Sequence, residues 1–364
     1  MPNVRRIGVL TGGGDAPGLN AVIRAAVKAC ENRGIECLGI PDSFDGLLEV
    51  DRPYPLTRKD VVGILRMGGT ILGTINRGNP FAEPVQTSDG EKDYGDRCLE
   101  IFERVGLDAL IAIGGDGTLT LSQKFYQLGM PIVGVPKTID NDIVGTVNTF
   151  GFDTAVAFAC DAIDRLHTTA AAHRRIMVVE VMGRNAGWIA LHAGMAGGAD
   201  IILIPEIPFD PERVAEAVRR RDAFGAKFTI VVVAEGARPL GGAQSIAIAA
   251  HGQYVERLGG IGHKVAIALE ELTGKEARTA VLGHLQRGGS PTAYDRVLAT
   301  RFGERAVELV VRGQFGKMVA SHPPDIVPVS LSEAVGKQKT IPLGHDLIHT
   351  ARSIGVTFGD DEES

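Results

Sequence analysis

Residues 7–30 read IGVLTGGGDAPGLNAVIRAAVKAC, and three patterns in this stretch decide the fold class. The apolar run 7–10 is typical of a buried strand. Residues 11–20 are rich in glycine and form a tight turn, and residues 22–30 then repeat apolar side chains at helical spacing. A strand, a glycine-rich turn and a helix in this order predict the first unit of an α/β protein.

The same order of strand, turn and helix recurs further along the chain. The other predicted strands and the turns that follow them are 109–113 with GGDGT (114–118), 132–135 with PKTIDND (136–142), 176–181 with MGRNAGW (182–188), 228–234 with Glu235 and Gly236, and 280–282 with GHLQRGG (283–289). This alternation predicts mainly parallel sheet with helices on both faces. In such sheets ligands bind beyond the carboxyl ends of the strands, so we expect these turns to converge on one cleft.

The composition is that of an ordinary globular protein. The 364 residues are 44% hydrophobic and 23% charged, which allows a large buried core and predicts about two domains. The net charge of −6 is spread over the chain without a basic run. We therefore expect no nucleic-acid partner, and any anionic ligand must be bound by local groups.

The cysteines and the hydropathy indicate the compartment. Cys30, Cys37, Cys98 and Cys160 form no CxxC pair, which favours reduced thiols over a disulfide framework. No apolar run approaches the ~18 residues needed to span a bilayer, and the first residues lead directly into a strand. We expect a cytoplasmic protein with no membrane partner and a frayed, acidic end at 359–364.

The glycine turns are candidates for binding phosphate, because backbone N–H groups at a helix N-terminus attract anions and a Cβ would hold a phosphate away. The turn at 12–14 serves equally well as a plain βα turn, and it lacks both the GK[ST] of a Walker A loop and the GxGxxG of a dinucleotide site. GGDGT is more specific. An aspartate between glycines before a helix suits Mg²⁺ that is otherwise bound by phosphate oxygens and water, which favours Asp116 as a metal ligand over a solvated turn residue.

PKTIDND places Lys137, Asp140 and Asp142 within six residues, directly after a buried strand. Two carboxylates this close repel each other unless a metal, a lysine or a substrate proton uses them. A kinase that acts on a hydroxyl needs a carboxylate base at the acceptor and cations at the transferring phosphoryl, and this turn offers both. The alternative is a polar turn without chemistry.

Cationic side chains gather at strand ends in the second half of the chain. They are Arg174, Arg175, Arg184, Arg278 and Arg287, with His284 between the last two. Arginine binds phosphate through two parallel hydrogen bonds, so the set indicates a phosphate-bearing acceptor. Glu235, at the end of another predicted strand, is either an acceptor for sugar hydroxyls or a turn residue.

These residues closely resemble the phosphofructokinase family over nearly the whole chain. The matching segments, in order, are GVLTGGGDAPGLNAVIR, GGTILGT, IGGDGT, PKTIDND, GFDTA, IDRL, VVEVMGR, AGGAD, AEG and VLGHLQRGGSPTAYDR. GGTILGTINRGNP and PKTIDND are most similar to the mixed-substrate bacterial group, whose members use ATP or pyrophosphate. The resemblance implies a glycolytic 6-phosphofructokinase that uses ATP as donor, Mg²⁺ as cofactor and fructose 6-phosphate as acceptor, giving fructose 1,6-bisphosphate.

The resemblance also implies the fold and its division. It predicts two Rossmann-like, three-layer α/β/α domains with mainly parallel sheets and an active-site cleft between them. The donor domain would take residues 1–151 and about 286–340. The sugar-phosphate domain would take residues 152–285 and about 341–364.

The resemblance assigns roles around the transferred phosphoryl group. Asp140 would be the base for the 1-hydroxyl of the sugar, with Lys137 and Arg184 as the other catalytic residues. Asp116 would bind Mg²⁺. The residues implied around the nucleotide are Gly14, Arg77, Gly115, Asp116, Gly117 and Thr118.

A second set of residues would bind the sugar phosphate. It consists of Thr138, Asp142, Met182, Gly183, Arg184, Glu235, His284 and Arg287. Arg175 and Arg278 match arginines that, in this family, reach the 6-phosphate from a neighbouring subunit. Their presence implies a homo-oligomer, a dimer or a tetramer, with an active site shared between subunits.

Two residues disagree about the donor. In the resembling family, pyrophosphate users generally carry an aspartate at the position of Gly117, and its carboxylate fills the space of the ATP α-phosphate. Lys137 is typical of pyrophosphate users, although some ATP-dependent members keep it. Exclusion by a carboxylate is nearly absolute whereas an extra ammonium helps either donor, so Gly117 favours ATP over the pyrophosphate-dependent alternative.

Three other functions compete with this interpretation. NAD kinases and lipid kinases use loops similar to GGDGT, but the segments VVEVMGR and LGHLQRGG argue against them. A non-catalytic nucleotide-binding sensor has no need of Asp140 as a base. A dehydrogenase is disfavoured because the chain lacks GxGxxG.

Overall fold

The computed structural model describes residues 4–76, 80–82, 84–248 and 257–360. Contacts divide the chain into two compact units. Unit 1 comprises Met1–Thr138, Ile143–Asp153 and Arg287–Gln338, and unit 2 comprises Ile139–Asp142, Thr154–Gln286 and Lys339–Ser364. Each unit is therefore assembled from segments that are far apart in the sequence.

Unit 1 is built on an eight-stranded sheet with the order β16-β15-β7-β6-β1-β2-β3, and β8 pairs with β7 off this path. The strands are β1 (Arg6–Gly12), β2 (Glu36–Ile40), β3 (Tyr54–Leu56), β6 (Ala109–Gly114), β7 (Ile132–Thr138), β8 (Phe150–Gly151), β15 (Lys317–His322) and β16 (Asp325–Ser330). Neighbouring strands are parallel except for two antiparallel pairs at the edges, β2 with β3 and β15 with β16. β6 and β7 are buried along their whole length, as parallel strands covered on both faces must be.

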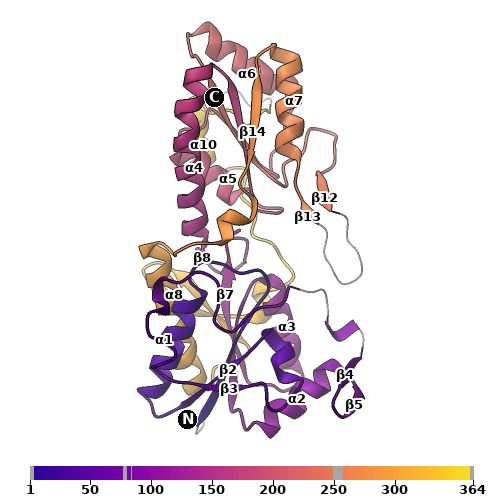
Figure 1. Cartoon of the computed structure of the whole chain (residues 1–364), viewed down its shortest axis with the longest axis vertical. Coiled ribbons are helices and arrows are strands. Elements are labelled where there is room, and N and C mark those ends of the chain that lie inside the picture. Colours follow the sequence, from indigo (N-terminus) through magenta and orange to yellow (C-terminus); the bar gives the residue numbers. More distant parts are fainter. Residues whose placement is uncertain (1–3, 77–79, 83, 249–256, 361–364) are drawn as a thin grey trace. The chain divides into compact units, whose positions relative to one another are not determined.

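Helices cover both faces of this sheet. α1 (Leu19–Glu31) and α8 (Ala293–Val311) lie on one face, and α2 (Tyr94–Arg104) and α3 (Asp116–Gln127) lie on the other (Figure 1). Successive residues of β1 face opposite sides, so Val9 joins the core with α1 and α8 whereas Leu10 joins the core with α2 and α3. The smaller elements are 3₁₀ helices at Ser43–Leu47, Ile64–Arg66 and Pro80–Ala82, the hairpin of β4 (Val85–Thr87) and β5 (Gly90–Lys92), and α9 (Leu331–Ala334).

Unit 2 holds a four-stranded sheet in which all neighbours are parallel, with the order β10-β11-β9-β14. Its strands are β9 (Ile176–Val181), β10 (Ile201–Leu203), β11 (Thr229–Ala234) and β14 (Ala277–Val281), and a hairpin is formed by β12 (Ile246–Ile248) and β13 (Arg257–Leu258). The α-helices are α4 (Phe152–His173), α5 (Trp188–Ala196), α6 (Pro211–Ala223), α7 (Ile261–Thr273) and α10 (Asp346–Ser353). A 3₁₀ helix lies at Gly283–Arg287. One core joins α6 and α7 to alternate residues of the sheet, while α5 packs on β10 and β11.

The predicted α/β class with mainly parallel sheets is confirmed. The chain passes between the units after residues 153, 286 and 338, and the short segment Ile139–Asp142 groups with unit 2. β14 starts three residues before the predicted strand. The prediction missed these residues because Arg278 and Thr279 are polar and do not continue the apolar run 280–282. Among the described helices, none is long and apolar enough to cross a membrane.

Candidate active site

The first glycine turn of unit 1 is packed too closely for side chains. A Cβ on Gly12 would lie 2.6 Å from Thr118 Oγ1 and 2.8 Å from Ser43 Oγ, and Gly13 has a left-handed φ of 76°. The turn is fixed by a neighbouring segment, since Thr74 Oγ1 donates to the Gly13 carbonyl oxygen at 2.6 Å and the Gly13 N–H donates to Ile75 at 3.0 Å. Thr74 was not predicted, although it lies in the quoted motif GGTILGT.

The second glycine turn lies beside the first. β1 and β6 are parallel neighbours in register, with Gly12 opposite Gly114, so both turns leave the same edge of the sheet. Gly115 caps α3, Asp116 and Gly117 form its exposed first turn, and Thr118 is buried. No described atom lies within 4 Å of where a Cβ on Gly117 would stand. The helix therefore presents free space and N–H groups at its N-terminus, which suits phosphate.

The residues at this helix start fit a Mg²⁺ ion that a nucleotide brings with it. Asp116 is the acidic residue in the first turn of α3. Within the described part of the chain, no group of three or more His, Cys, Asp or Glu side chains could hold a metal ion. Mg²⁺ commonly uses one or two carboxylates together with phosphate oxygens and water, so a single exposed aspartate beside a phosphate site meets its needs.

Two predicted cations of unit 1 lie on the first glycine turn. Lys137 is 3% exposed, and its ammonium donates to the Gly14 carbonyl oxygen. Arg287 Nη1 donates to the Asp15 carbonyl oxygen at 3.1 Å and lies 2.9 Å from where a Cβ on Gly14 would stand. Gly14 thus allows the guanidinium to approach the backbone. Arg287, predicted for the sugar-phosphate pocket, is placed by the structure beside the glycine turn.

The turn that carries Asp140 belongs to unit 2. Asp140 is 4% exposed, and the next residue, Asn141, has a left-handed φ of 51°. Lys339 holds this turn in two ways: its ammonium donates to Asn141 Oδ1 at 3.1 Å, and its N–H donates to the Asp142 carbonyl oxygen at 2.8 Å. Burial lowers the pKa of Lys339 to about 8, and the charge of Asp142 opposes that shift. These contacts explain why Ile139–Asp142 groups with unit 2.

Lys339 is itself fixed by residues that we did not predict. Trp188 Nε1 donates to the Lys339 carbonyl oxygen at 2.8 Å, and the Lys339 ammonium lies 5.5 Å from the Trp188 ring centroid. Glu206 accepts from the N–H groups of Ile341 at 2.9 Å and Gly187 at 3.0 Å. Burial raises the pKa of Glu206, and the hydrogen bonds from these backbone N–H groups lower it in part. Trp188 is the last residue of the quoted turn MGRNAGW, whereas Glu206 and Lys339 belong to no recognisable motif.

Glu235 brings the AEG and MGR segments together. Its Oε1 accepts from the Arg184 N–H at 3.1 Å. Burial raises the pKa of Glu235 to about 7, and the nearby charge of Asp140 contributes to the rise. Arg184 has a left-handed φ of 51°, and a Cβ on Gly236 would lie 1.8 Å from its carbonyl oxygen. Glycine is therefore required at 236. The effect of Asp140 on the pKa of Glu235 also shows that these two carboxyl groups lie in one region of unit 2.

Two buried or half-buried amides complete this region. Gln286, 1% exposed, accepts from the Met182 N–H at 2.9 Å through Oε1. Gln244 Nε2 donates to the Gly236 carbonyl oxygen at 2.9 Å and to Asn185 Oδ1 at 3.1 Å. The predicted residues Met182 and Gly183 are buried within the same turn. Gln286 lies inside a predicted motif, but nothing in the local sequence indicates the role of Gln244.

Arg175 and Arg278 lie at the opposite edge of the unit 2 sheet. Arg175 directly precedes β9, and Arg278 is the second residue of its parallel neighbour β14, so both lie at the amino ends of these strands. Arg184 and Glu235 follow β9 and β11 and therefore lie at the carboxyl ends. Both arginines pair with Glu276, whose pKa is lowered chiefly by its hydrogen bond to Arg175. His284, exposed after β14, lies in the 3₁₀ helix at Gly283–Arg287.

Three other predicted residues have simple placements. Thr138 ends β7 and is 8% exposed. Asp142 is half-buried and is held through its backbone by Lys339, as described above. Arg77, predicted near the donor, lies outside the described residues.

Comparison with known proteins identifies the family. The phosphofructokinase family model matches residues 6–310. An "ATP-dependent 6-phosphofructokinase" of Chloroflexus aggregans is 57% identical over 359 residues, 98% of each chain. A "Pyrophosphate--fructose 6-phosphate 1-phosphotransferase" of Amycolatopsis methanolica is 54% identical over 340 residues, 93% of this chain and 96% of that one. The crystal structure of Pichia pastoris phosphofructokinase in the T-state aligns with a TM-score of 0.80 and 32% identity, over 92% of this chain and 36% of that chain. This chain belongs to the phosphofructokinase family.

Proposed function

We propose that this phosphofructokinase is ATP-dependent and transfers the γ-phosphoryl group of ATP to the 1-hydroxyl of fructose 6-phosphate, giving fructose 1,6-bisphosphate in glycolysis. The observation that carries the proposal is the buried Asp140 turn, which stands beside Glu235 and is held by Lys339. A carboxylate excluded from water and fixed in position can take the proton of a sugar hydroxyl. The relatives named as 6-phosphofructokinases support the acceptor.

The residues of each unit divide the chemistry. In unit 2, Asp140 takes the proton of the 1-hydroxyl as the new O–P bond forms and the bond from the γ-phosphorus to the β,γ-bridging oxygen breaks, which releases ADP. Arg184 stabilises the charge of the transferring phosphoryl. In unit 1, Lys137 and the N–H groups around Gly14, Gly115 and Thr118 bind the donor phosphates. Asp116 would hold Mg²⁺, which would neutralise phosphate charge.

The choice of ATP depends on Gly117. The space around its missing Cβ is empty of described atoms, so an α-phosphate meets no side chain there. Lys137 argues for pyrophosphate less strongly, because its ammonium is directed at the Gly14 carbonyl oxygen and can approach phosphates of either donor. One relative at 57% identity is named as ATP-dependent and another at 54% identity is named as pyrophosphate-dependent. Overall identity therefore does not separate the two donors, and the support for ATP comes from Gly117.

The sugar phosphate is bound by Thr138, Asp142, Met182, Gly183, Arg184, Glu235, His284 and Arg287. Arg175 and Arg278 of one subunit bind the 6-phosphate of a sugar that is held in the active site of a neighbouring subunit. The strand β9 separates Arg175 from Arg184 by about 20 Å, since six residues rise ~3.3 Å each. Such a separation places the two arginines at opposite ends of β9 and does not favour their joint contact with one hexose phosphate, which supports a homo-oligomer, a dimer or a tetramer, with shared sites.

The protein works in the cytoplasm. All four cysteines are free thiols, and Cys30, Cys37 and Cys98 are buried. Free buried thiols are typical of a reducing compartment.

Initial rates test the proposal directly. Fructose 6-phosphate and Mg²⁺ are supplied with ATP, ADP or pyrophosphate in turn, and the formation of fructose 1,6-bisphosphate is followed. We expect ATP to support the fastest turnover. A much faster rate with pyrophosphate would refute the donor and leave the acceptor intact, whereas no product with any donor would refute the activity.

A further inference from the structure

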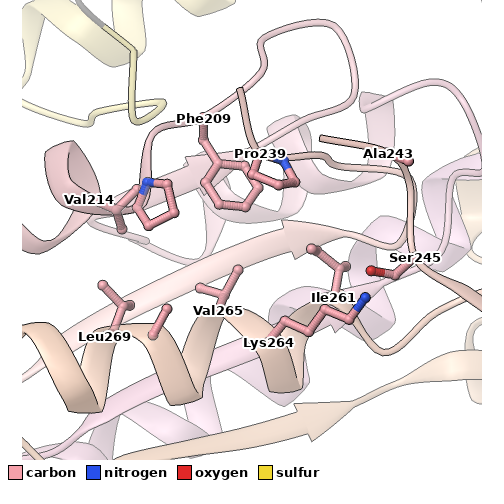
Figure 2. Close-up of a pocket in the computed structure, with 11 residues that line it drawn as sticks. Phe209, Val214, Pro239, Ala243, Ser245, Ile261, Lys264, Val265 and Leu269 are labelled. Atoms are coloured by element: carbon pink, nitrogen blue, oxygen red, sulfur yellow. The ribbon is translucent and has the colours of Figure 1, made fainter. Parts of the chain in front are cut away.

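A pocket of about 210 Å³ lies in unit 2 between α7 and two loop segments (Figure 2). Its walls are Phe209, Pro211, Val214, Pro239, Ala243, Ser245, Ile261, Lys264, Val265, Ala268 and Leu269. The two loop segments are tied to each other, because the Phe209 N–H donates to the Arg238 carbonyl oxygen at 3.1 Å and the Leu240 N–H donates to the Phe209 carbonyl oxygen at 2.8 Å. The pocket is thus a fixed part of unit 2, and none of the predicted site residues lines it.

Most of the pocket wall is apolar and belongs to the core of unit 2. Phe209, Val214, Val265 and Leu269 are each less than 5% exposed. An apolar cavity of 150 Å³ in another protein is known to bind benzene. A cavity of about 210 Å³ therefore accepts one aromatic ring or a branched alkyl group with a short extension.

Two polar groups lie at one end of this apolar space. Ser245 is 3% exposed, and its buried Oγ has no hydrogen-bond partner within the described residues. The side chain of Lys264 is exposed, and Figure 2 shows its ammonium directed toward the Ser245 hydroxyl. A buried hydroxyl without a partner is costly, so a ligand acceptor at this end would satisfy it. The adjacent positive charge selects an anionic acceptor.

We propose that this pocket binds a small amphipathic carboxylate, with an aromatic or branched apolar body against α7 and its carboxylate on Lys264 and Ser245. Sugar phosphates and nucleotides do not fit this description. Their hydroxyl groups would lose water against Val214, Val265 and Leu269 without gaining hydrogen bonds. The site is therefore distinct from the phosphoryl-transfer site in ligand chemistry as well as in position.

The loop that lines the pocket also reaches the sugar-phosphate residues. Gln244, next to Ser245, donates to Gly236 and Asn185, which adjoin Glu235 and Arg184. A ligand on Ser245 biases this loop, so occupancy changes the KM for fructose 6-phosphate by about fivefold with a smaller change in kcat. This effect rests on the proposed function, whereas binding to the pocket does not.

The experiment uses phenylacetate as probe and phenylacetamide as its neutral counterpart, titrated into the full-length protein by calorimetry. We expect phenylacetate to bind with a Kd below about 1 mM and phenylacetamide at least about tenfold more weakly. Lys264→Gln should weaken phenylacetate by about tenfold, while the exposed Lys227→Gln, with the same charge change, should not. Ala268→Leu should abolish binding by filling the pocket, while Ile267→Leu on the outer side of α7 should not.

Each result decides a part of the proposal. Equal binding of the two probes, or no binding of phenylacetate, would overturn the carboxylate site. Unaltered binding by a folded Ala268→Leu protein would place the ligand elsewhere and overturn it as well; if that variant does not fold, the Lys264→Gln result, from an exposed side chain, decides. Binding of phenylacetate without a change in the KM for fructose 6-phosphate would overturn the coupling alone. If the unaltered protein showed no kinase activity, the proposed function would be refuted, and binding to the pocket would still be tested by calorimetry.

Discussion

The two units present their predicted site residues in different ways. Unit 1 removes side chains: Gly12 and Gly14 allow close approach of Thr118 and Arg287, and Gly117 leaves open space before α3. Unit 2 instead buries two carboxyl groups near each other, with Asp140 at 4% exposure and a pKa of about 7 for Glu235, whereas the buried charge on the first glycine turn of unit 1 is the ammonium of Lys137. The difference indicates that unit 1 selects its ligand by shape and backbone N–H groups, whereas unit 2 controls chemistry through charge. Substitutions at the glycines of unit 1 should therefore act through the group that they place in the space of the donor, and substitutions at the carboxyl groups of unit 2 should act through charge.

The largest effect is expected from removing a charge in unit 2 without changing its shape. Asp140→Asn keeps the size of the side chain and removes the base, so kcat should fall by about 10²- to 10⁴-fold. Binding of fructose 6-phosphate should stay within a few fold, because the turn is still held by Lys339. Turnover measured by fructose 1,6-bisphosphate formation and binding measured by calorimetry separate the two effects. Near-normal turnover would show that Asp140 is not the base.

A carboxylate introduced into the open space of unit 1 should affect only the donor. Gly117→Asp should lower kcat/KM for ATP by about 10²-fold through clash and repulsion with the α-phosphate, and uncover weak use of pyrophosphate. Gly117→Ala is the matched control, since its Cβ would meet no described atom within 4 Å and should leave ATP use intact. Rates with both donors at fixed fructose 6-phosphate check this. Undiminished ATP use by Gly117→Asp would remove the support for ATP selection.

Loss of a cation at the other edge of the unit 2 sheet should act on the acceptor alone. Arg175→Ala should raise the KM for fructose 6-phosphate by about 20-fold and leave the KM for ATP unchanged, because a phosphate contact made through two hydrogen bonds is lost. Arg174→Ala, a change of the same kind at the preceding exposed residue, is the control.

The same variant tests whether sites are shared. Hybrids of Arg175→Ala with Asp140→Asn chains should recover part of the activity, because one of their sites combines an intact Arg175 with an intact Asp140. Proven hybrids that stay inactive would contradict sharing between subunits.

The comparison also shows what a sequence can predict. Strands followed by glycine turns are local patterns, so the α/β class and the turns around Gly14 and Asp116 were accessible without a structure. Lys339 and Asn141 are 198 residues apart, and their contact depends on how the chain returns to unit 2. The raised pKa of Glu235 and the pocket beside α7 likewise arise from packing of distant segments. Such features have no local signature.

A smaller effect is expected where the chain holds the Asp140 turn from a distance. Lys339→Met removes the donor to Asn141 Oδ1 but keeps the backbone hydrogen bond to Asp142, so kcat should fall by about fivefold while the KM for ATP stays unchanged. The exposed Lys337→Met is the matched control. A larger rise in KM for ATP than fall in kcat would show that Lys339 does not act through this turn.

The smallest effect concerns stability and depends on pH. The pKa of Glu235 is about 7 in the folded protein against an ordinary value of 4.5, so between these values the folded protein binds more protons than the unfolded chain. Stability contributed by this group is therefore lost as pH rises from 4.5 to 7, because its charge becomes buried near Asp140. Glu235→Gln keeps an acceptor for the Arg184 N–H and carries no charge. Its apparent melting temperature should exceed that of the parent by about 2 °C at pH 8, and the gap should shrink at pH 5.5. A gap of equal size at both pH values would mean that Glu235 does not change its charge in this range, and the contrast between a charge-controlled unit 2 and a shape-controlled unit 1 would lose one of its supports.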